Sequence, residues 1–396
     1  MNSSTSSSNR VYLKIVLAIT LGLGSAMGMV RLVYVGFDAS AESIMSRVVA
    51  ARKALPKILE TEEPLVMVYG SSMVQAGFSP RQFDKEVGDQ NKSVKSFNFG
   101  FGGLNPFFQD YLSRRIKDEF KAEDRRLKLA VIEFNPFQTT RARWNGALPS
   151  VDSFITMMAT DKELWDIALE DPTRGALLFN IHYLRGDISA AMATSFFGQP
   201  LRGERERSKL PQDEEMQELR NELGSQLNDK FEEEYPDYDG SPWNWGWQGG
   251  GTIPEERSAE TMEIVYRYYD AGKIDYRLDS DRINRVNCCD ILEMEFEPEL
   301  VEAFIRIVEN FGEFSDKVEV IMLPRNTEWI EYSPEARQRL DAAIAQIEQA
   351  TGVTIRDYQQ IDGLSNQMFS DTTHLNRYQG AVRFTHHLVE QYAEGL

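Results

Sequence analysis

The sequence predicts an α/β fold in three layers, with a parallel sheet of five strands between two layers of helices. Five runs of strand length carry this prediction, at residues 65–69, 94–99, 127–134, 318–323 and 353–357. The first three alternate with helical patterns over short connections, as in βαβ units. The alternation stops after the third run and returns before the fourth. We therefore expect one domain, residues 63–138 and 297–396, interrupted by a long, mostly helical insertion at 139–296.

Three segments precede the first strand. Residues 1–10 are mostly serine, asparagine and threonine, and we expect them to be disordered. Residues 11–37 are largely apolar, although Arg31 interrupts them, and we expect a transmembrane helix that anchors the chain with its body outside the cytoplasm. A cleaved signal peptide is the alternative. Residues 38–62 carry apolar side chains at spacings of three and four, which predicts a helical linker.

Helical periodicity marks the remaining elements. In the α/β domain we expect helices at 80–87, 106–120, 298–311, 333–351 and 376–392. In the insertion we expect them at 161–169, 173–184, 211–234 and 254–269. Between the last two, the chain is dense in glycine, proline and aromatic residues, which indicates a loop.

Charge and cysteine content argue against several classes of function. The chain has 62 acidic and 43 basic side chains and a net charge of −19, whereas nucleic-acid binding needs a basic surface. The only two cysteines, Cys288 and Cys289, are adjacent, which excludes a disulfide framework and a cysteine-rich zinc site. We expect no metal and no cofactor.

Small and polar residues follow the first three strands. Gly70-Ser71-Ser72 comes after the first strand, a glycine-rich turn at 100–103 after the second, and Asn135 after the third. Since right-handed crossovers place these ends at one edge of a parallel sheet, we expect them to lie together. Open α/β sheets bind ligands at that edge. The structural alternative is a set of turns that use small residues because they fit.

Asp371 and His374 lie three residues apart, between the fifth strand and the last helix. At that spacing in a turn, the carboxylate can accept from one imidazole nitrogen and leave the other free to act as a base. A serine nucleophile needs such a base, together with donors for the oxyanion that develops. A backbone N–H of the glycine-rich turn and the amide of Asn135 are the candidate donors. Alternatively, Asp371 caps the last helix and His374 is an ordinary residue of its first turn.

Taken together, these motifs resemble the four blocks of the SGNH, or GDSL-type, hydrolase superfamily. They are most similar to its membrane-anchored branch of alginate O-acetyltransferases and D-alanyl-transfer proteins of teichoic acid, in which Gly-Ser-Ser replaces the usual Gly-Asp-Ser. The resemblance implies a flavodoxin-like fold with Ser72 as nucleophile, His374 as base and Asp371 as its orienter. It also implies an oxyanion hole formed by the N–H of Ser72, a glycine N–H and Asn135.

The resemblance leaves the glycine open between Gly102 and Gly103, with Gly100 as a third candidate. The chain departs from the family pattern at two places. The third block reads Glu133-Phe134-Asn135-Pro136 where the family usually has Gly-x-Asn-Asp. The long insertion is also not typical of the small family members.

The insertion is expected to contribute to substrate binding. Trp243, Trp245 and Trp247 alternate in its glycine-rich loop, and flat aromatic faces can stack on sugar rings. Arg141 and Arg143 follow the third strand closely, where they could hold an anionic group. The structural alternatives are tryptophans that pin the loop to the body and arginines that are solvated.

The leading expectation is therefore an extracytoplasmic O-acyltransferase that forms an acyl-enzyme at Ser72. By resemblance, it would pass an acetyl group to a hydroxyl of an envelope or exported polysaccharide, beside a membrane-bound O-acyltransferase as partner. A secreted or anchored carbohydrate or lipid esterase of the same fold is the first alternative. A non-catalytic scaffold in a complex for polysaccharide biosynthesis is the second.

Overall fold

A computed structural model describes most of the chain. The described residues are 5–35, 44–185, 214–234, 258–273, 291–327, 331–370, 373–376 and 379–396. The chain forms two compact units, of which the first comprises residues 1–46 and 149–205 and the second residues 47–148 and 206–396. The sheet and the candidate site lie in the second unit.

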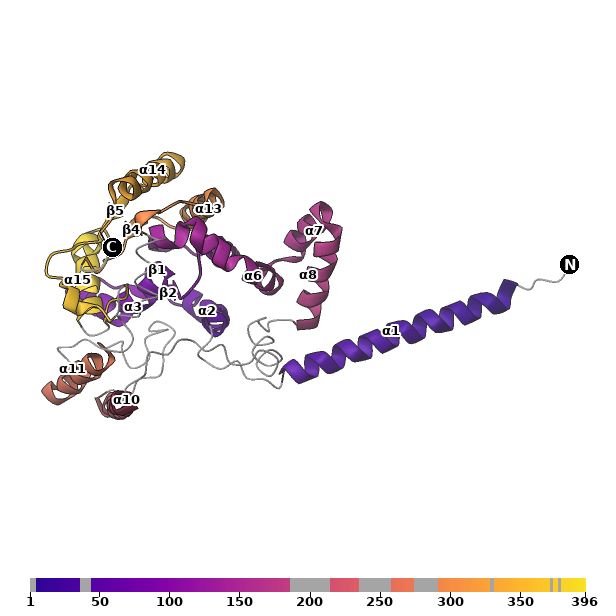
Figure 1. Ribbon diagram of the computed structural model, residues 1–396, viewed down its shortest axis with the longest axis horizontal. Helices are drawn as coiled ribbons and strands as arrows, with labels where there is room; N and C mark the ends of the chain where they lie inside the picture. Colours follow the sequence, from indigo (N-terminus) through magenta and orange to yellow (C-terminus); the bar gives the residue numbers. More distant parts are fainter. Residues whose placement is uncertain are drawn as a thin grey trace. The chain divides into compact units, whose positions relative to one another are not determined.

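The second unit, shown with its helices in Figure 1, is built on a sheet of five parallel strands. The strand order is β2-β1-β3-β4-β5. These strands are β1 (Leu65–Ser71), β2 (Lys95–Phe101), β3 (Leu127–Glu133), β4 (Val318–Met322) and β5 (Ile355–Asp357). The strand order is that of doubly wound, flavodoxin-like sheets. The chain leaves β1 toward β2 and later continues on the other side of β1 at β3, so the order reverses between β1 and β3.

Helices pack on both faces of this sheet. The helices that accompany it are α2 (Ile44–Leu59), α3 (Ser72–Gly77), α4 (Pro80–Gly88), α5 (Pro106–Ala122), α13 (Pro298–Phe314), α14 (Pro334–Thr351) and α15 (Gly380–Tyr392). The other helices are α1 (Thr5–Val35), α6 (Arg141–Met158), α7 (Asp161–Glu170), α8 (Pro172–Arg185), α10 (Glu214–Glu234) and α11 (Ala259–Lys273). Short 3₁₀ helices are η1 (Pro136–Thr139), η5 (Asn366–Met368) and η6 (Ala393–Gly395).

The alternation of side chains along β2 separates the two faces. On one face its residues are aromatic, and the ring of Phe101 contacts that of Tyr69 at 6.1 Å between centroids. On the other face they are small or polar, namely Ser96, Asn98 and Gly100. The amide nitrogen of Asn98 donates to the carbonyl oxygens of Val74 at 2.9 Å and Phe78 at 2.8 Å, at the end of α3. This face of β2 therefore holds α3 directly against the sheet.

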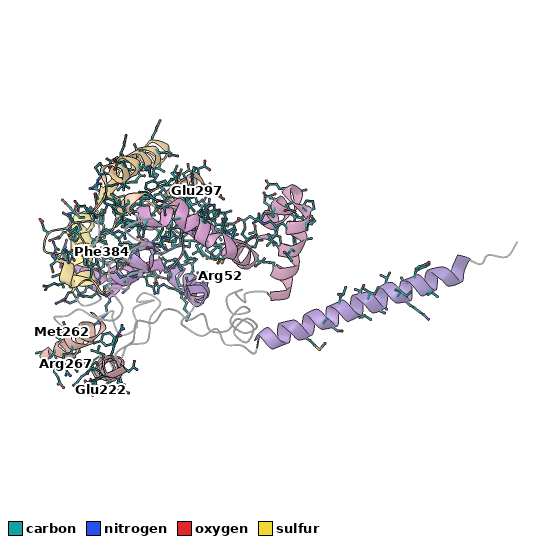
Figure 2. The ribbon with its side chains drawn as sticks, viewed as in Figure 1. Arg52, Glu222, Met262, Arg267, Glu297 and Phe384 are labelled. Carbon is teal, nitrogen blue, oxygen red and sulfur yellow. The ribbon has the colours of Figure 1, made fainter. Side chains whose placement is uncertain are left out.

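The aromatic face of the sheet packs on α5 and α13. The ring of Tyr69 lies 4.9 Å from that of Phe311 on α13, and its hydroxyl donates to the carbonyl of Gln109 on α5 at 2.6 Å. Just after β3, Phe134 contacts Phe304 on α13 at 5.1 Å. On the opposite face lies Phe384 of α15, which Figure 2 labels. Its side chain is fully buried in a core shared with α3 and α4.

Helices α10 and α11 form a pair with a small core of its own. Leu223 and Leu227 of α10 are buried with Ile264 of α11. Figure 2 labels Glu222 on α10 with Met262 and Arg267 on α11, and shows the two helices side by side. Both helices lie within the predicted insertion, 139–296, and with α6, α7 and α8 they make its described part mostly helical, as the sequence predicts.

The five-stranded parallel sheet predicted from the sequence is confirmed, although β1 and β2 run two residues further than expected. They do so because Gly70 still pairs with Gly100, and Ser71 with Phe101. Helices α3 and α6 were not predicted, and the last helix begins at Gly380 rather than at residue 376.

Residues 11–37 were predicted to form a membrane anchor. Helix α1 covers most of this segment and begins at Thr5, within the polar stretch expected to be disordered. Within the described residues, no helix is both long enough and apolar enough to span a membrane. The transmembrane part of the predicted architecture is therefore not supported.

The close packing of α3 predicts a large effect of a single methyl group at Gly100. A Cβ there would lie 2.2 Å from the backbone nitrogen of Gln75 and 2.7 Å from the carbonyl of Ser71, so α3 or β2 has to shift. We expect Gly100→Ala to lower the free energy of unfolding by about 1–3 kcal/mol, measured by urea denaturation.

The matched control is Gly312→Ala, because Gly312 is an exposed residue of α13 where a Cβ would meet nothing within 4 Å. Since alanine favours helices over glycine, this control should raise stability by about 0.5–1 kcal/mol. Equal effects of the two substitutions would contradict the close packing of α3 on β2.

Candidate active site

Ser72 lies where strand β1 turns into helix α3. Strand β1 ends at Ser71, whose hydroxyl accepts a hydrogen bond from the backbone N–H of Met73 at 3.2 Å and so caps the helix. Ser72 is the first residue of α3 and is half-buried. The cap keeps the hydroxyl of Ser71 occupied within the turn, which leaves that of Ser72 as the candidate nucleophile.

His374 reaches Ser72 from a loop near the C-terminus. Its Nε2 lies 2.7 Å from the Oγ of Ser72, a hydrogen-bond distance. The loop is closed behind it by a bridge between Phe369 and Leu375, and by a hydrogen bond from the backbone N–H of Ser370 to the carbonyl of His374 at 2.7 Å. Leu375 is buried in the same core as α3 and α15. The backbone of His374 and Leu375 is therefore held in place beneath the imidazole.

The second ring nitrogen of His374, Nδ1, lies 3.1 Å from the hydroxyl of Thr373. Asp371, the predicted orienter of this histidine, lies outside the described residues. The structure thus brings together the predicted nucleophile and base, and it leaves the role of Asp371 as a prediction.

The glycine-rich turn after β2 lies beside Ser72, and its three candidate glycines differ. The N–H of Gly100 donates to the side chain of Asn98 at 3.0 Å and is occupied there. Gly103 is exposed and has a φ of 74°, as the tight turn over residues 101–104 requires. A Cβ on Gly102 would lie 3.6 Å from the Cβ of Ser72. Gly102 therefore lies in van der Waals contact range of the candidate nucleophile.

Arg47 of α2 holds the same turn from outside the sheet, which the sequence did not indicate. Its Nε donates to the carbonyl of Gly100. Its Nη2 lies 3.2 Å from the carbonyl and 3.3 Å from the side-chain oxygen of Asn98. A guanidinium has several donors in one plane, so a single side chain binds the carbonyls of two alternate residues along one edge of β2.

Glu133, the last residue of β3, lies on the other side of the turn and was not predicted as a site residue. Its carboxylate accepts from the backbone N–H of Ser71 at 2.6 Å and contacts the Ser71 hydroxyl at 3.0 Å. Burial raises the pKa of this carboxyl, while the hydrogen bonds from Ser71 and the charge of Arg325 offset part of the rise. A Cβ on Gly70 would lie 2.4 Å from the carboxylate, so glycine is needed there.

Asn135 is buried, and each end of its amide has a different partner. Its nitrogen donates to Glu133 at 2.9 Å, and its oxygen accepts from the guanidinium of Arg325 at 2.8 Å. The nitrogen also lies 3.3 Å from the hydroxyl of Ser71 and 3.5 Å from the sulfur of Met73. These two residues flank Ser72 in the chain, so the amide faces the turn that carries the candidate nucleophile.

Arg325, just after β4, is a further residue that sequence reasoning missed. It is 5% exposed, and its guanidinium lies 3.8 Å above the ring of Phe137. The sequence feature that could have pointed to Arg325 is its position just after the end of a predicted strand. The contact with Asn135 depends on β4 lying next to β3, which the sequence order alone does not give.

Ser71, Glu133 and Asn135 meet where the strand order reverses, between β1 and β3. Ser71 ends β1, Glu133 ends β3, and Asn135 follows two residues later. Doubly wound sheets bind their ligands outside the carboxyl ends of the strands at this point. The position of the site thus agrees with the general rule for such folds.

Of the residues predicted to bind substrate from the insertion, the structure describes the two arginines. Arg141 pairs with the carboxylates of Glu295 at 2.9 Å and Glu297 at 3.3 Å, so two acidic groups already balance its charge. Arg143 is half-buried on α6. The three tryptophans, Trp243, Trp245 and Trp247, lie outside the described residues.

The chain matches no protein-family model and no curated protein sequence. The resemblance to the SGNH superfamily therefore stays a prediction that rests on the residues of this chain. The contact between Ser72 and His374 is an observation of the structure and does not depend on that resemblance.

The contact between Ser71 and Glu133 predicts that a carboxylate in place of the serine is harmful. Ser71→Asp would set two buried carboxylates side by side, and we expect it to lower the free energy of unfolding by about 1–3 kcal/mol at pH 8. Combining it with Glu133→Gln removes the repulsion, so the double variant should be more stable than the sum of the single effects predicts. Strict additivity in urea denaturation would contradict this interaction.

Proposed function

We propose that the chain is a serine-dependent acyl-transfer enzyme with Ser72 as nucleophile and His374 as general base. The observation that carries this proposal is the distance of 2.7 Å between the Oγ of Ser72 and the Nε2 of His374. A serine hydroxyl is a weak nucleophile unless a base takes its proton, and this distance is short enough for that transfer.

In the proposed first step, the Oγ of Ser72 attacks the carbonyl carbon of an ester while its proton passes to the Nε2 of His374. The bond from that carbon to the leaving oxygen then breaks, and the imidazolium returns the proton to the leaving group. An acyl-Ser72 ester remains. In the second step, His374 takes the proton of the acceptor hydroxyl, the acceptor oxygen attacks the acyl carbon, and Ser72 is released with its proton restored.

The oxyanion that develops in both steps needs nearby hydrogen-bond donors. We assign these to the backbone N–H groups of Ser72 and Gly102 and to the amide of Asn135. Support comes from the position of Gly102 beside Ser72 and from the amide nitrogen of Asn135, which lies close to both neighbours of Ser72. Asp371 is proposed to orient His374 through Nδ1, beside the hydroxyl of Thr373.

The proposed acceptor is a hydroxyl of an envelope or exported polysaccharide, outside the cytoplasm and beside a membrane-bound O-acyltransferase. This part rests on the resemblance of Gly70-Ser71-Ser72, Asn135 and His374 to the anchored SGNH branch. Transfer to water, as in an esterase, uses the same residues.

The nucleophile is tested by labelling the full chain with a fluorophosphonate probe. The Oγ of Ser72 should displace fluoride from phosphorus and form a stable ester, so mass spectrometry should place the label on Ser72. We expect Ser72→Ala to abolish labelling, and His374→Ala or Asp371→Asn to slow it by about 10³-fold or more.

The control for this experiment is His386→Ala. His386 lies on α15, where it contacts Glu86 at 2.7 Å and takes no part in the site, so its removal should leave the labelling rate unchanged. A wild-type chain that does not label, or that labels equally without Ser72, would refute the assignment and favour a scaffold.

The acceptor is tested with 4-nitrophenyl acetate as donor and soluble neutral or anionic oligosaccharides as acceptors. Transfer predicts an acetylated oligosaccharide in the mass spectrum and faster release of 4-nitrophenolate when the sugar is added. If acetate is the only acyl product with every oligosaccharide, the enzyme is an esterase.

A further inference from the structure

The amide of Asn135 can act as an oxyanion donor only if its nitrogen, and not its oxygen, faces Ser72. The two ends of a carboxamide have nearly the same shape, so packing alone does not choose between them. Hydrogen-bond partners of opposite character do. In this structure a guanidinium contacts the oxygen of Asn135 at 2.8 Å, and the carboxylate of Glu133 contacts its nitrogen at 2.9 Å.

A guanidinium has only donors and an ionised carboxylate has only acceptors. The group formed by Arg325, Asn135 and Glu133 therefore admits one orientation of the amide. Reversing it would set the Arg325 donors against the NH₂ group of Asn135 and the Glu133 acceptors against its carbonyl oxygen. Both new contacts would be repulsive inside a buried site, where unpaired polar groups are costly.

Arg325 is itself held in one place. Its guanidinium lies 3.8 Å over the ring of Phe137, and Phe137 stacks on Tyr332 with 9° between the ring planes. Its backbone N–H donates to the carbonyl of Gln359 at 2.9 Å. The side chain is 5% exposed, so solvent competes little for its donors. It can therefore fix the amide of Asn135 rather than follow it.

One N–H of Asn135 is taken by Glu133, and the other faces the turn at Ser72. The acceptors near that second hydrogen are poor, since the hydroxyl of Ser71 is 3.3 Å and the sulfur of Met73 is 3.5 Å from the nitrogen. A charged donor on the amide oxygen also draws electron density from the nitrogen, which makes its hydrogens better donors. An oxyanion formed at Ser72 would be a stronger acceptor than either neighbour.

We propose that Arg325 is a positioning residue that orients and polarises the amide of Asn135 toward the oxyanion formed at Ser72. The role rests on the proposed acyl-transfer function. In this role Arg325 acts on the oxyanion through the amide of Asn135, while its charge also favours the ionised carboxylate of Glu133. Loss of a positioning residue should therefore lower kcat, whereas loss of a residue that binds substrate should raise KM.

The test is a double-substitution cycle in the full chain, with 4-nitrophenyl acetate as the probe and kcat and KM as separate readouts. Asn135→Ala should lower kcat by about 10²–10³-fold, as the loss of one oxyanion donor does, and change KM by less than about threefold. Arg325→Gln should lower kcat by about 10-fold or more, with KM again little changed. Because Arg325 acts through Asn135, the double variant should be no slower than Asn135→Ala.

Two further variants distinguish the proposed positioning effect from a general loss of stability. Arg325→Lys keeps a positive charge beside Glu133 but lacks the planar fork, so it serves if Arg325→Gln does not fold, and it should show the same non-additivity. Arg306→Gln breaks a different arginine–carboxylate contact, to Asp110 at 2.9 Å, and should leave kcat unchanged.

The positioning role is overturned if the losses in kcat multiply in the double variant, or if Arg325→Gln raises KM and leaves kcat unchanged. In either case the wild-type protein still turns over the ester, and the proposed function stands. A wild-type protein that neither turns over the ester nor labels at Ser72 overturns the proposed function, and the positioning role falls with it.

Discussion

The structure of the site depends on how closely three chain segments approach one another at the end of β1. Gly70 and Gly100 are paired across β1 and β2, and neither has room for a Cβ. On one side the missing side chain admits the carboxylate of Glu133, and on the other it admits the backbone of α3 at Gln75. This lack of side chains allows a helix to begin directly at the sheet edge, with Ser72 at its first position. The turn that carries Ser72 is therefore held from both neighbouring strands and not by its own sequence alone.

Much of this arrangement follows from local sequence patterns. The strands could be predicted because apolar runs of strand length alternate with segments of helical period over short connections. Once the sheet is parallel, right-handed crossovers bring the ends of β1, β2 and β3 to one edge, so Ser72 and Asn135 were expected there together. We expected His374 near Ser72 because a serine nucleophile needs a base. His374 is the one histidine outside both the predicted last helix and the predicted insertion. The choice of Gly102 needed the structure, because all three glycines lie in the same turn.

What the sequence did not reveal depends on partners that are distant in the chain. Glu133 looked like an ordinary charge at a strand end, and its role appears only when β1 lies beside β3 and the Ser71 N–H becomes its donor. Arg325 is 190 residues from Asn135 along the chain. Periodicity assigns Asn376 to the last helix, but Asn376 precedes it, and its side chain accepts from the N–H groups of Gln379 and Gly380 where the helix begins.

The contact of Arg47 with the end of β2 sets a lower limit on the fragment that can be studied by itself. A chain begun at Leu65 would contain all five strands together with Ser72 and His374. It would nevertheless lack the guanidinium that binds the carbonyls of Gly100 and Asn98, immediately before the turn that holds Gly102. Such a fragment would keep every residue of the proposed chemistry. It would lose the arginine that holds β2 just before the turn with Gly102, the proposed oxyanion donor. Truncation from the N-terminus should therefore stop before α2, at residue 43 or earlier.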